Sequence, residues 1–222
     1  MKTASWEDFG ITADKALNAL QEYINRTETT IDAVVPIMRG GNFLGSYLAY
    51  KLNILRILPV QYKYFFNKVN KAELRQLLFT VDKDLLPQAP TILVVEGDYC
   101  YGTTTKQACQ DIKKTIPDAK ILLAADLMDY SYRNVVDEYT EATFYGRYTN
   151  HCEELSVEQC KKLGIEDFGV APWENIDEEK AVMSLKQFPY KGLESAINKS
   201  DHKLEIDLSG LQEKWGEKID EN

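Results

Sequence analysis

Two short segments of the chain carry residue types suited to binding phosphate. The longer is Glu96–Thr105, which follows the apolar run Thr91–Val95 and leads into a helical pattern at Thr104–Thr115. Backbone N–H groups of a Gly/Thr-rich turn at a helix start suit a phosphate monoester, and carboxylates suit ribose hydroxyls or Mg²⁺. A nucleotide P-loop would need a lysine after the glycine turn, and Gly102–Thr105 has none. The alternative interpretation is an ordinary strand–turn–helix connection with threonine capping.

The shorter segment contains Arg39, Gly40 and Gly41. It lies between the apolar run Ile31–Met38 and a helical pattern at Phe43–Leu52. Two glycines let backbone amides approach an anion, and the helix N-terminus adds positive potential. Taken by itself, this segment is explained more simply as a tight turn with a solvated arginine.

The elements that must position these segments follow from hydrophobic periodicity. Strands are expected at Ile31–Met38, Ile57–Phe65, Thr91–Val95, Lys120–Asp126 and Ala142–Tyr148. Helices are expected from a capped start at Ser5 and at Phe43–Leu52 and Thr104–Thr115. This alternation indicates an α/β fold with an open, mostly parallel sheet flanked by helices, which binds ligands beyond the carboxyl ends of its strands.

Two regions lack a clear strand pattern. Asn67–Pro90 is polar, so we expect a mobile segment with a helical turn at Ala72–Leu78. After Ile165 the pattern is irregular, and the charged tail suggests one helix around Leu208–Trp215.

Composition excludes several classes of protein. A formal charge of −9 disfavours nucleic acid as a partner, because phosphate backbones require a concentrated basic face. No apolar run is long enough for a membrane span, and Met1–Gly10 lacks the features of a secretion signal. The four cysteines show no zinc-binding spacing. We therefore expect a cytoplasmic protein with reduced thiols and small-molecule ligands.

Together the two segments resemble the ligand loops of type I phosphoribosyltransferases. The stretch from Val95 to Thr104 is similar to their phosphoribosyl-pyrophosphate motif. Arg39-Gly40-Gly41 is similar to their pyrophosphate loop, which often contains a non-proline cis peptide bond in that family. Both occur in the family's order and spacing. The similarity is greatest to bacterial xanthine-guanine and hypoxanthine enzymes and extends over about residues 4–178.

Two further segments resemble the family's base-binding region. Ala142–Arg147 is similar to the strand that ends in the purine-contacting lysine, so Arg147 would take that position. Phe168–Glu174 is similar to the hood segment. The resemblance implies that Phe168 stacks on the base and Arg147 donates to an exocyclic oxygen, and it places Gly169 and Trp173 in the base site. The alternatives are core aromatic residues and a surface arginine.

The resemblance also implies roles for the two loops. Pyrophosphate would bind to Arg39, Gly40 and Gly41. The phosphoribosyl group would bind to Glu96, Gly97, Asp98, Tyr101, Gly102, Thr103 and Thr104. The catalytic positions would be held by Asp98 and Cys100, and Mg²⁺ would bind to Glu96 and Asp98.

This sequence departs from the family pattern at three positions. The family usually has a second acid where Gly97 stands, an aspartate where Cys100 stands and a threonine where Tyr101 stands. Asp98 replaces the second acid one residue later. A thiol substitutes poorly for a carboxylate unless its pKa is lowered. If the chain is an ordinary transferase, Gly97→Asp or Cys100→Asp should raise its activity.

Three functions follow from the resemblance. The leading one is a Mg²⁺-dependent phosphoribosyltransferase of purine salvage, which transfers 5-phosphoribosyl from phosphoribosyl pyrophosphate to a purine-like base. The alternatives are a relative that binds phosphoribosyl pyrophosphate or a nucleotide as a regulatory ligand, and an enzyme that hydrolyses a ribosyl-phosphate bond. We expect a homo-oligomer. The domain would cover residues 1–178, with a hood from 142–148 and 165–178, and 179–222 would form a C-terminal extension.

Overall fold

The computed structural model describes residues 2–66, 72–133, 138–150, 155–165, 168–174 and 203–206. The chain divides into two compact units. The larger comprises Met1–Val60 and Phe79–Pro172, and the smaller comprises Gln61–Leu78 and Trp173–Asn222. Both predicted phosphate-binding segments belong to the larger unit.

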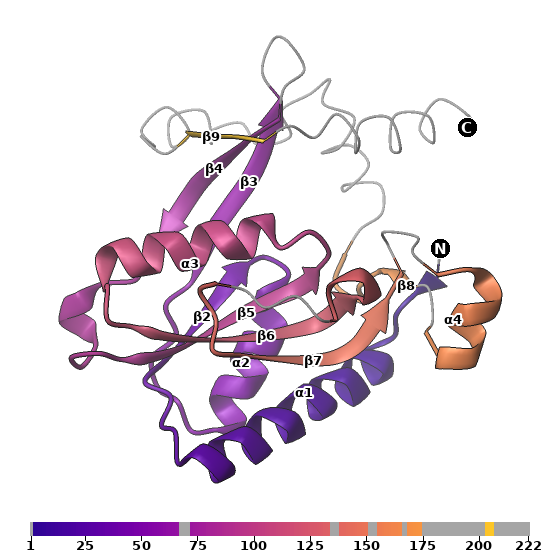
Figure 1. Ribbon diagram of the computed structural model, residues 1–222, viewed down its shortest axis with the longest axis horizontal. Coiled ribbons are helices and arrows are strands. Elements are labelled where there is room, and N and C mark those ends of the chain that lie inside the picture. The colour runs from indigo at the N-terminus through magenta and orange to yellow at the C-terminus, as the bar shows by residue number, and fades with distance from the viewer. Residues whose placement is uncertain are drawn as a thin grey trace. The chain divides into compact units, whose positions relative to one another are not determined.

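A parallel sheet forms the centre of the larger unit. Its strands, in spatial order, are β7 (Ala142–Thr149), β6 (Lys120–Asp129), β5 (Thr91–Tyr99) and β2 (Ala33–Met38). Helices α1 (Trp6–Thr27) and α2 (Gly41–Lys51) cover one face, and α3 (Thr103–Thr115) covers the other (Figure 1). The predicted α/β fold with a mostly parallel sheet is confirmed.

Shorter elements complete the larger unit. They are β1 (Lys2–Thr3), η1 (Lys83–Leu85), η2 (Tyr130–Tyr132), α4 (Val157–Leu163) and β8 (Phe168–Val170). Strands β1 and β8 pair in parallel as a separate two-stranded sheet.

The core consists of strands buried on both faces. Ile92–Val95 of β5 and Ile121–Ala125 of β6 are almost completely inaccessible to solvent. Because helices cover both faces of a parallel sheet, its central strands read as continuous apolar runs rather than as alternating patterns. This is why these two strands were recognisable in the sequence.

Helix α1 begins where the sequence predicts. The Ser5 hydroxyl accepts a hydrogen bond from the Asp8 backbone N–H at 3.1 Å, and the Ser5 N–H donates to the Asp8 carboxylate at 2.8 Å. This reciprocal capping box satisfies two backbone donors at the helix start. The buried stripe of the helix then packs on the sheet through Phe9, Thr12, Ala13, Ala16, Leu17 and Leu20.

The smaller unit contains all but the first residue of β3 (Val60–Phe66), all but the last residue of β4 (Ala72–Phe79), and β9 (Lys203–Ile206), in that order. The helical turn predicted at Ala72–Leu78 is wrong, because this segment is strand β4. Its Ala, Glu, Leu, Arg and Gln residues favour helix locally. Antiparallel pairing with β9, which lies more than a hundred residues away in the chain, overrides that preference.

Two predictions about the C-terminal part stay untested. The helix around Leu208–Trp215 and the domain boundary at residue 178 lie outside the described residues. The segment Asn67–Pro90 was expected to be mobile, and its residues 67–71 also lie outside the described residues.

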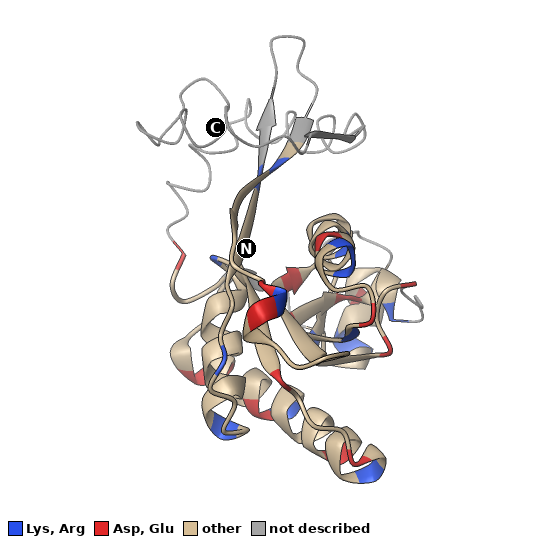
Figure 2. Cartoon of the chain, turned by 90° about the vertical axis from the view of Figure 1, so that its left-hand side faces the viewer, with Lys and Arg blue, Asp and Glu red and all other residues tan. Residues whose placement is uncertain are grey.

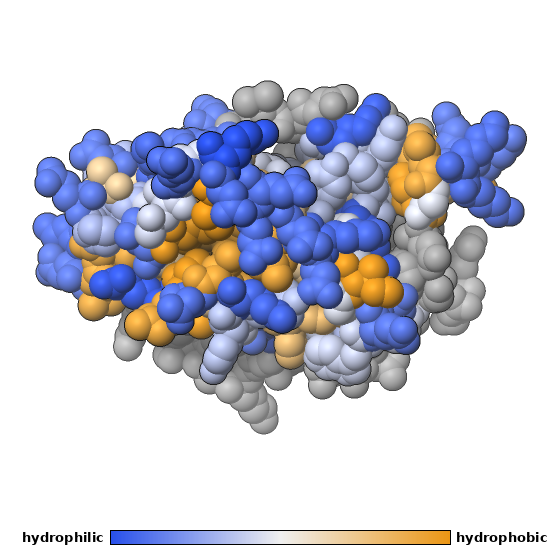
Figure 3. Space-filling view, turned by 90° about the horizontal axis from the view of Figure 1, so that it is seen from below, coloured by the Kyte–Doolittle hydropathy of each residue, from blue (hydrophilic) through white to orange (hydrophobic). Residues whose placement is uncertain are grey.

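The surface of the larger unit carries both signs of charge, interspersed over its helices (Figure 2). On the side covered by α1 and α2, hydrophobic atoms appear between polar ones (Figure 3). The exposed large hydrophobic residues of these helices are Trp6, Ile11 and Tyr50. Within the described ranges, no helix combines the length and apolar composition that crossing a membrane requires.

Candidate functional site

The two predicted phosphate-binding segments lie in contact with each other. A Cβ atom built on Gly97 would lie 2.8 to 3.0 Å from the backbone C, Cα and O atoms of Gly40. A Cβ built on Gly40 would lie 3.4 Å from the Gly97 Cα and 3.9 Å from the Glu96 Oε1. The Glu96 carboxylate also accepts a hydrogen bond from the Gly97 N–H at 2.9 Å. Segments 57 residues apart in sequence therefore lie side by side at the carboxyl end of the sheet.

Gly41 brings the start of α2 onto strand β5. A Cβ atom at this position would lie 2.1 Å from the Val95 carbonyl oxygen, which no side chain can tolerate. The peptide bond between Met38 and Arg39, two bonds earlier than the one that joins Gly40 to Gly41, is a non-proline cis bond. The feature implied for a pyrophosphate loop is thus present at Arg39.

Helix α3 begins at Gly102, which has a left-handed backbone conformation with φ of 67°. The Lys106 N–H makes the first intrahelical bond, to the Gly102 carbonyl at 2.8 Å. The N–H groups of Thr103, Thr104 and Thr105 come before this bond, so they have no carbonyl acceptor within the helix. Thr103 and Thr104 are half-buried.

The helix starts in the two predicted loops differ from the other described helix starts. Helices α1 and α4 both have capping boxes, formed by Ser5 with Asp8 and by Ser156 with Gln159. The first residues of α2 and α3 follow Gly40 and Gly102, and neither start has a side-chain cap. The alternative that threonine caps α3 is therefore wrong. Uncapped amides at a helix N-terminus are well suited to an anionic ligand.

The predicted loop Glu96–Thr105 is shorter than expected. Glu96–Tyr99 continue strand β5 and pair with β6, where Glu96 lies opposite Ala125 and Asp98 opposite Leu127. The loop prediction is wrong for these four residues because β6 is long enough to provide hydrogen-bonding partners for them. Only Cys100 to Gly102 lie between the strand and α3.

The strand conformation fixes the directions of the two acids. Side chains of a strand alternate between faces, so Glu96 and Asp98 point to one face and Gly97 to the other. Glu96 is half-buried and Asp98 is exposed. A second acid at position 97 would point to the face opposite to that of Asp98. Asp98 therefore does not replace the missing acid at the same face of the strand.

Arg147 lies on the same row of the sheet as Asp98. Asp98, Leu127 and Arg147 are consecutive partners across β5, β6 and β7. Two strand spacings therefore separate the Cα atoms of Asp98 and Arg147, or about 10 Å. The structure brings Arg147 to the same edge and face as the predicted acids.

Asp126 is a residue of this region that the sequence analysis missed. The register places it between Gly97 and Gly146, on the row next to that of Asp98 and Arg147. Its side chain is 5% exposed and hydrogen-bonds to the Thr12 hydroxyl of α1. The signal for it was an acid inside the otherwise apolar run of β6.

Burial raises the pKa of the Asp126 carboxyl from 3.8 to about 6. The hydrogen bond from Thr12 and the positive charge of Arg147 lower this pKa, and the negative charge of Asp98 raises it. The charges of Arg147 and Asp98 therefore shift the pKa of a buried carboxyl in opposite directions, and that pKa lies near 6.

The predicted base-binding residues outside β7 are less completely described. The backbone of Phe168–Val170 forms β8, in which Phe168 lies opposite Lys2. The side chain of Phe168 lies outside what the structure describes, so its stacking role and the place of Gly169 in the base site stay predictions. Trp173 belongs to the smaller unit. Its proposed contact with a base also stays a prediction.

The site offers carboxylates but no complete protein cage for a metal ion. Among the residues that the structure describes, no group of three or more His, Cys, Asp and Glu side chains is arranged to hold a metal. Mg²⁺ commonly binds through one or two carboxylates together with substrate phosphates and water. Glu96 and Asp98, on one face of one strand, fit that donor set.

Three of the four cysteines lie among the described residues: Cys100 and Cys160 are half-buried, and Cys109 is buried. Cys152 lies outside the described residues. Cys100 is half-buried in the short turn after β5. Its thiol stands at the position where the family resemblance implies a carboxylate.

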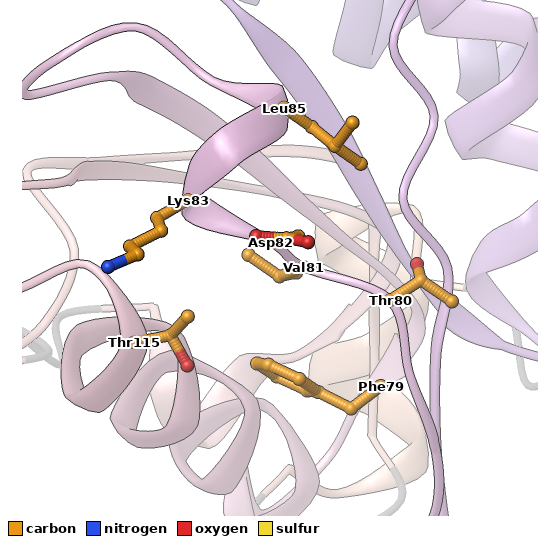
Figure 4. A pocket seen from close by; sticks show the side chains of 7 residues that line it. All are labelled: Phe79, Thr80, Val81, Asp82, Lys83, Leu85 and Thr115. Atoms are coloured by element: carbon orange, nitrogen blue, oxygen red, sulfur yellow. The ribbon is translucent and has the colours of Figure 1, made fainter.

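One cavity of the larger unit lies away from this site. It has a volume of about 590 Å³ and is lined by Phe79–Lys83, Leu85 and Thr115 (Figure 4). Thr115 ends α3, whereas Gly102 precedes its first residue. A helix of 13 residues separates the cavity from the candidate phosphate turn by about 20 Å.

Comparison with known structures supports the fold. A purine phosphoribosyltransferase from Pyrococcus horikoshii matches with a TM-score of 0.55 and 16% identity, over 79% of this chain and 95% of that chain. This chain has the fold of the purine phosphoribosyltransferases. The xanthine-guanine-hypoxanthine phosphoribosyltransferase of Helicobacter pylori matches with a TM-score of 0.55 and 17% identity, over 81% of this chain and 96% of that chain.

A third structure with this fold is a hypothetical protein from Neisseria gonorrhoeae with bound ppGpp. It matches with a TM-score of 0.56 and 18% identity, over 84% of this chain and 98% of that chain. No protein-family model matches the sequence, and a search of curated proteins gives no match. The phosphoribosyltransferase resemblance seen in the sequence is thus confirmed at the level of the fold.

Proposed function

We propose that this protein is a Mg²⁺-dependent phosphoribosyltransferase that transfers 5-phosphoribosyl from phosphoribosyl pyrophosphate to a purine or purine-like base. The observation that carries this proposal is the contact between Gly40 and Gly97. It joins two uncapped, glycine-preceded helix starts at the carboxyl end of a sheet with the phosphoribosyltransferase fold. One helix start suits pyrophosphate and the other suits the 5-phosphate.

In the proposed reaction the bond from C1 of the ribose to pyrophosphate breaks, and a bond from C1 to a ring nitrogen forms. Pyrophosphate leaves with the electron pair, and the proton of the ring nitrogen passes to water. Arg39 and the amides of Gly40 and Gly41 hold the leaving group. The amides and hydroxyls of Thr103 and Thr104 hold the 5-phosphate.

Catalysis in such a site rests mainly on positioning and the exclusion of water, because the adjoining starts of α2 and α3 would hold the two phosphate-bearing ends of phosphoribosyl pyrophosphate. Bound Mg²⁺, held by Glu96 and Asp98, would neutralise charge on the leaving group. Arg147 donates hydrogen bonds to an exocyclic oxygen of the base, with a geometry more rigid than that of lysine.

The experiment that tests this proposal has two stages. Isothermal titration with phosphoribosyl pyrophosphate and Mg²⁺ is followed by a screen for pyrophosphate release with purines, pyrimidines and small acids. We expect saturable binding and turnover with at least one purine. Absence of binding at millimolar ligand would eliminate the phosphate site itself. Turnover with a pyrimidine and with no purine would eliminate the purine assignment.

A second candidate function is binding of phosphoribosyl pyrophosphate or a nucleotide as a regulatory ligand. Two observations favour it: the backbone of Gly40 fills the space that a second acid at position 97 would need, and Cys100 replaces a carboxylate. The structural neighbour from Neisseria, which has bound ppGpp, shows that this fold accommodates a nucleotide of that kind. Binding without turnover on any base would support the regulatory function.

The remaining expectations are a homo-oligomer located in the cytoplasm. Light scattering of the purified protein tests the first, and fractionation of cells tests the second. A monomer at micromolar concentration would contradict the oligomer.

A further inference from the structure

Three tyrosines surround the turn between β5 and α3. Tyr99 ends β5, Tyr101 precedes Gly102, and Tyr132 belongs to η2 after β6. The ring of Tyr132 makes edge-to-face contacts with both others, at 5.8 Å from the Tyr99 centroid and 6.4 Å from the Tyr101 centroid. The candidate phosphate turn is therefore bordered by an aromatic cluster.

The rings of Tyr99 and Tyr101 have different environments. Tyr99 is 7% exposed, and its hydroxyl oxygen would lie 2.3 Å from a Cβ atom built on Gly102. It packs directly against the turn and supports it. Tyr101 is 43% exposed and directly precedes Gly102, so its ring adjoins the turn from the solvent side.

The third ring is held in place by its own segment. The buried Asp129 carboxylate accepts a hydrogen bond from the Ser131 N–H at 2.9 Å, which caps η2. The Arg133 guanidinium lies 3.9 Å from the centre of the Tyr130 ring and donates to the Tyr130 carbonyl at 2.6 Å. These contacts fix η2, and with it the position of Tyr132 beside Tyr101.

We propose that Tyr101 and Tyr132 form a subsite for a flat aromatic group attached directly to the phosphate that the Gly102–Thr104 turn binds. The inference rests on the proposed phosphate site but concerns a different part of the ligand. A base linked through ribose is one sugar away from the 5-phosphate, whereas Tyr101 adjoins the turn itself. The ligand class is therefore an aryl phosphate or a nucleotide with a second aromatic group beyond its phosphate.

The physical basis is the chemistry of the tyrosine ring. Its face stacks on flat aromatic groups, and few rotatable bonds are immobilised when it does so. Stacking of one aromatic group on such a ring strengthens binding by roughly tenfold, with wide variation between sites.

The test compares three probes by isothermal titration: inorganic phosphate, ribose 5-phosphate and phenyl phosphate. Wild-type protein should bind phenyl phosphate roughly tenfold more tightly than inorganic phosphate. Tyr101→Ala should lower the affinity for phenyl phosphate more than the affinity for inorganic phosphate, so that this preference is lost, and Tyr101→Phe should retain it. Tyr50→Ala is the matched control, because Tyr50 is 87% exposed on α2. It should bind all three probes as wild type does.

Two results would overturn the inference while leaving the phosphate site in place. One is equal affinity of the wild type for phenyl phosphate and inorganic phosphate. The other is an equal loss of affinity for all three probes in Tyr101→Ala, which would mean that the ring only supports the turn. If none of the probes binds to wild type, the phosphate site and the aromatic subsite both fail.

Discussion

The contact between Gly97 and Gly40 predicts that position 97 tolerates no side chain. An alanine there would place its Cβ within 2.8 to 3.0 Å of three backbone atoms of Gly40. These atoms cannot rotate away as the end of a flexible side chain can. The pyrophosphate loop would have to move as a unit, or β5 would have to separate from it.

The magnitude follows from two opposing effects. Replacing glycine by alanine inside a strand normally stabilises by about 0.5–1 kcal/mol, because it restricts the unfolded chain. Overpacking against atoms that cannot move costs about 1–3 kcal/mol. We expect Gly97→Ala to lower the free energy of unfolding by about 1–2 kcal/mol, which corresponds to a fall in Tm of roughly 2–8 °C for a chain of this size. Gly97→Asp would place a charged side chain against the same Gly40 atoms. The sequence suggested that this substitution would raise activity, and we now expect that it would not.

Denaturant unfolding measures the stability of Gly97→Ala beside Gly10→Ala, where a Cβ meets no atom within 4 Å. The control should be more stable than wild type by up to about 1 kcal/mol, since Gly10 lies in helix α1. Titrations should show Gly97→Ala binding Mg²⁺-pyrophosphate about tenfold more weakly, a change of 1.4 kcal/mol, with ribose 5-phosphate affected less. A variant as stable as the Gly10→Ala control, with unchanged pyrophosphate affinity, would refute this reasoning.

Four further predictions concern single residues. Because the folded pKa of Asp126, about 6, exceeds its ordinary 3.8, its ionised form destabilises the fold above pH 6. Asp126→Asn should therefore stabilise the protein at pH 8 by up to about 3 kcal/mol, and denaturant curves should show this gain vanishing near pH 4. Thr12→Val should raise the Asp126 pKa further and cost about 1–3 kcal/mol, measurable by carboxyl NMR and unfolding. Ser5→Ala should cost about 1 kcal/mol by the same unfolding assay, through loss of the α1 cap. Arg147→Ala should weaken affinity for the base while leaving affinity for phosphoribosyl pyrophosphate unchanged, and an equal loss of both would contradict its role.

Much of the site was predictable because its signals are local. Gly41 and Gly102 stand at positions where the backbone must approach another backbone or adopt a left-handed conformation. Such requirements leave glycine in the sequence whatever the surroundings. The capped start at Ser5 was equally readable, since Ser5 and Asp8 satisfy each other within one turn.

Other features depend on partners distant in the chain. Glu96–Tyr99 looked like a loop because acids and glycine follow an apolar run, but β6 supplies the partners that keep them in a strand. Segment Ala72–Phe79 is composed of helix-favouring residues, yet β9 pairs with it. Asp126 was not predictable in this way, because its buried carboxylate accepts a hydrogen bond from Thr12, more than a hundred residues earlier.

The sequence by itself determined the alternation of strands and helices and the two glycine loops. These loops resemble those of the phosphoribosyltransferases, and so they indicated the fold. Only the tertiary structure decided that Gly40 rests on Gly97, that Asp98 shares a row with Arg147, and that Tyr132 contacts Tyr101. Backbone preference and hydrophobic period act between near neighbours, so one segment reveals them. Close contact and electrostatic coupling act through space, so they exist only after folding has brought distant segments together.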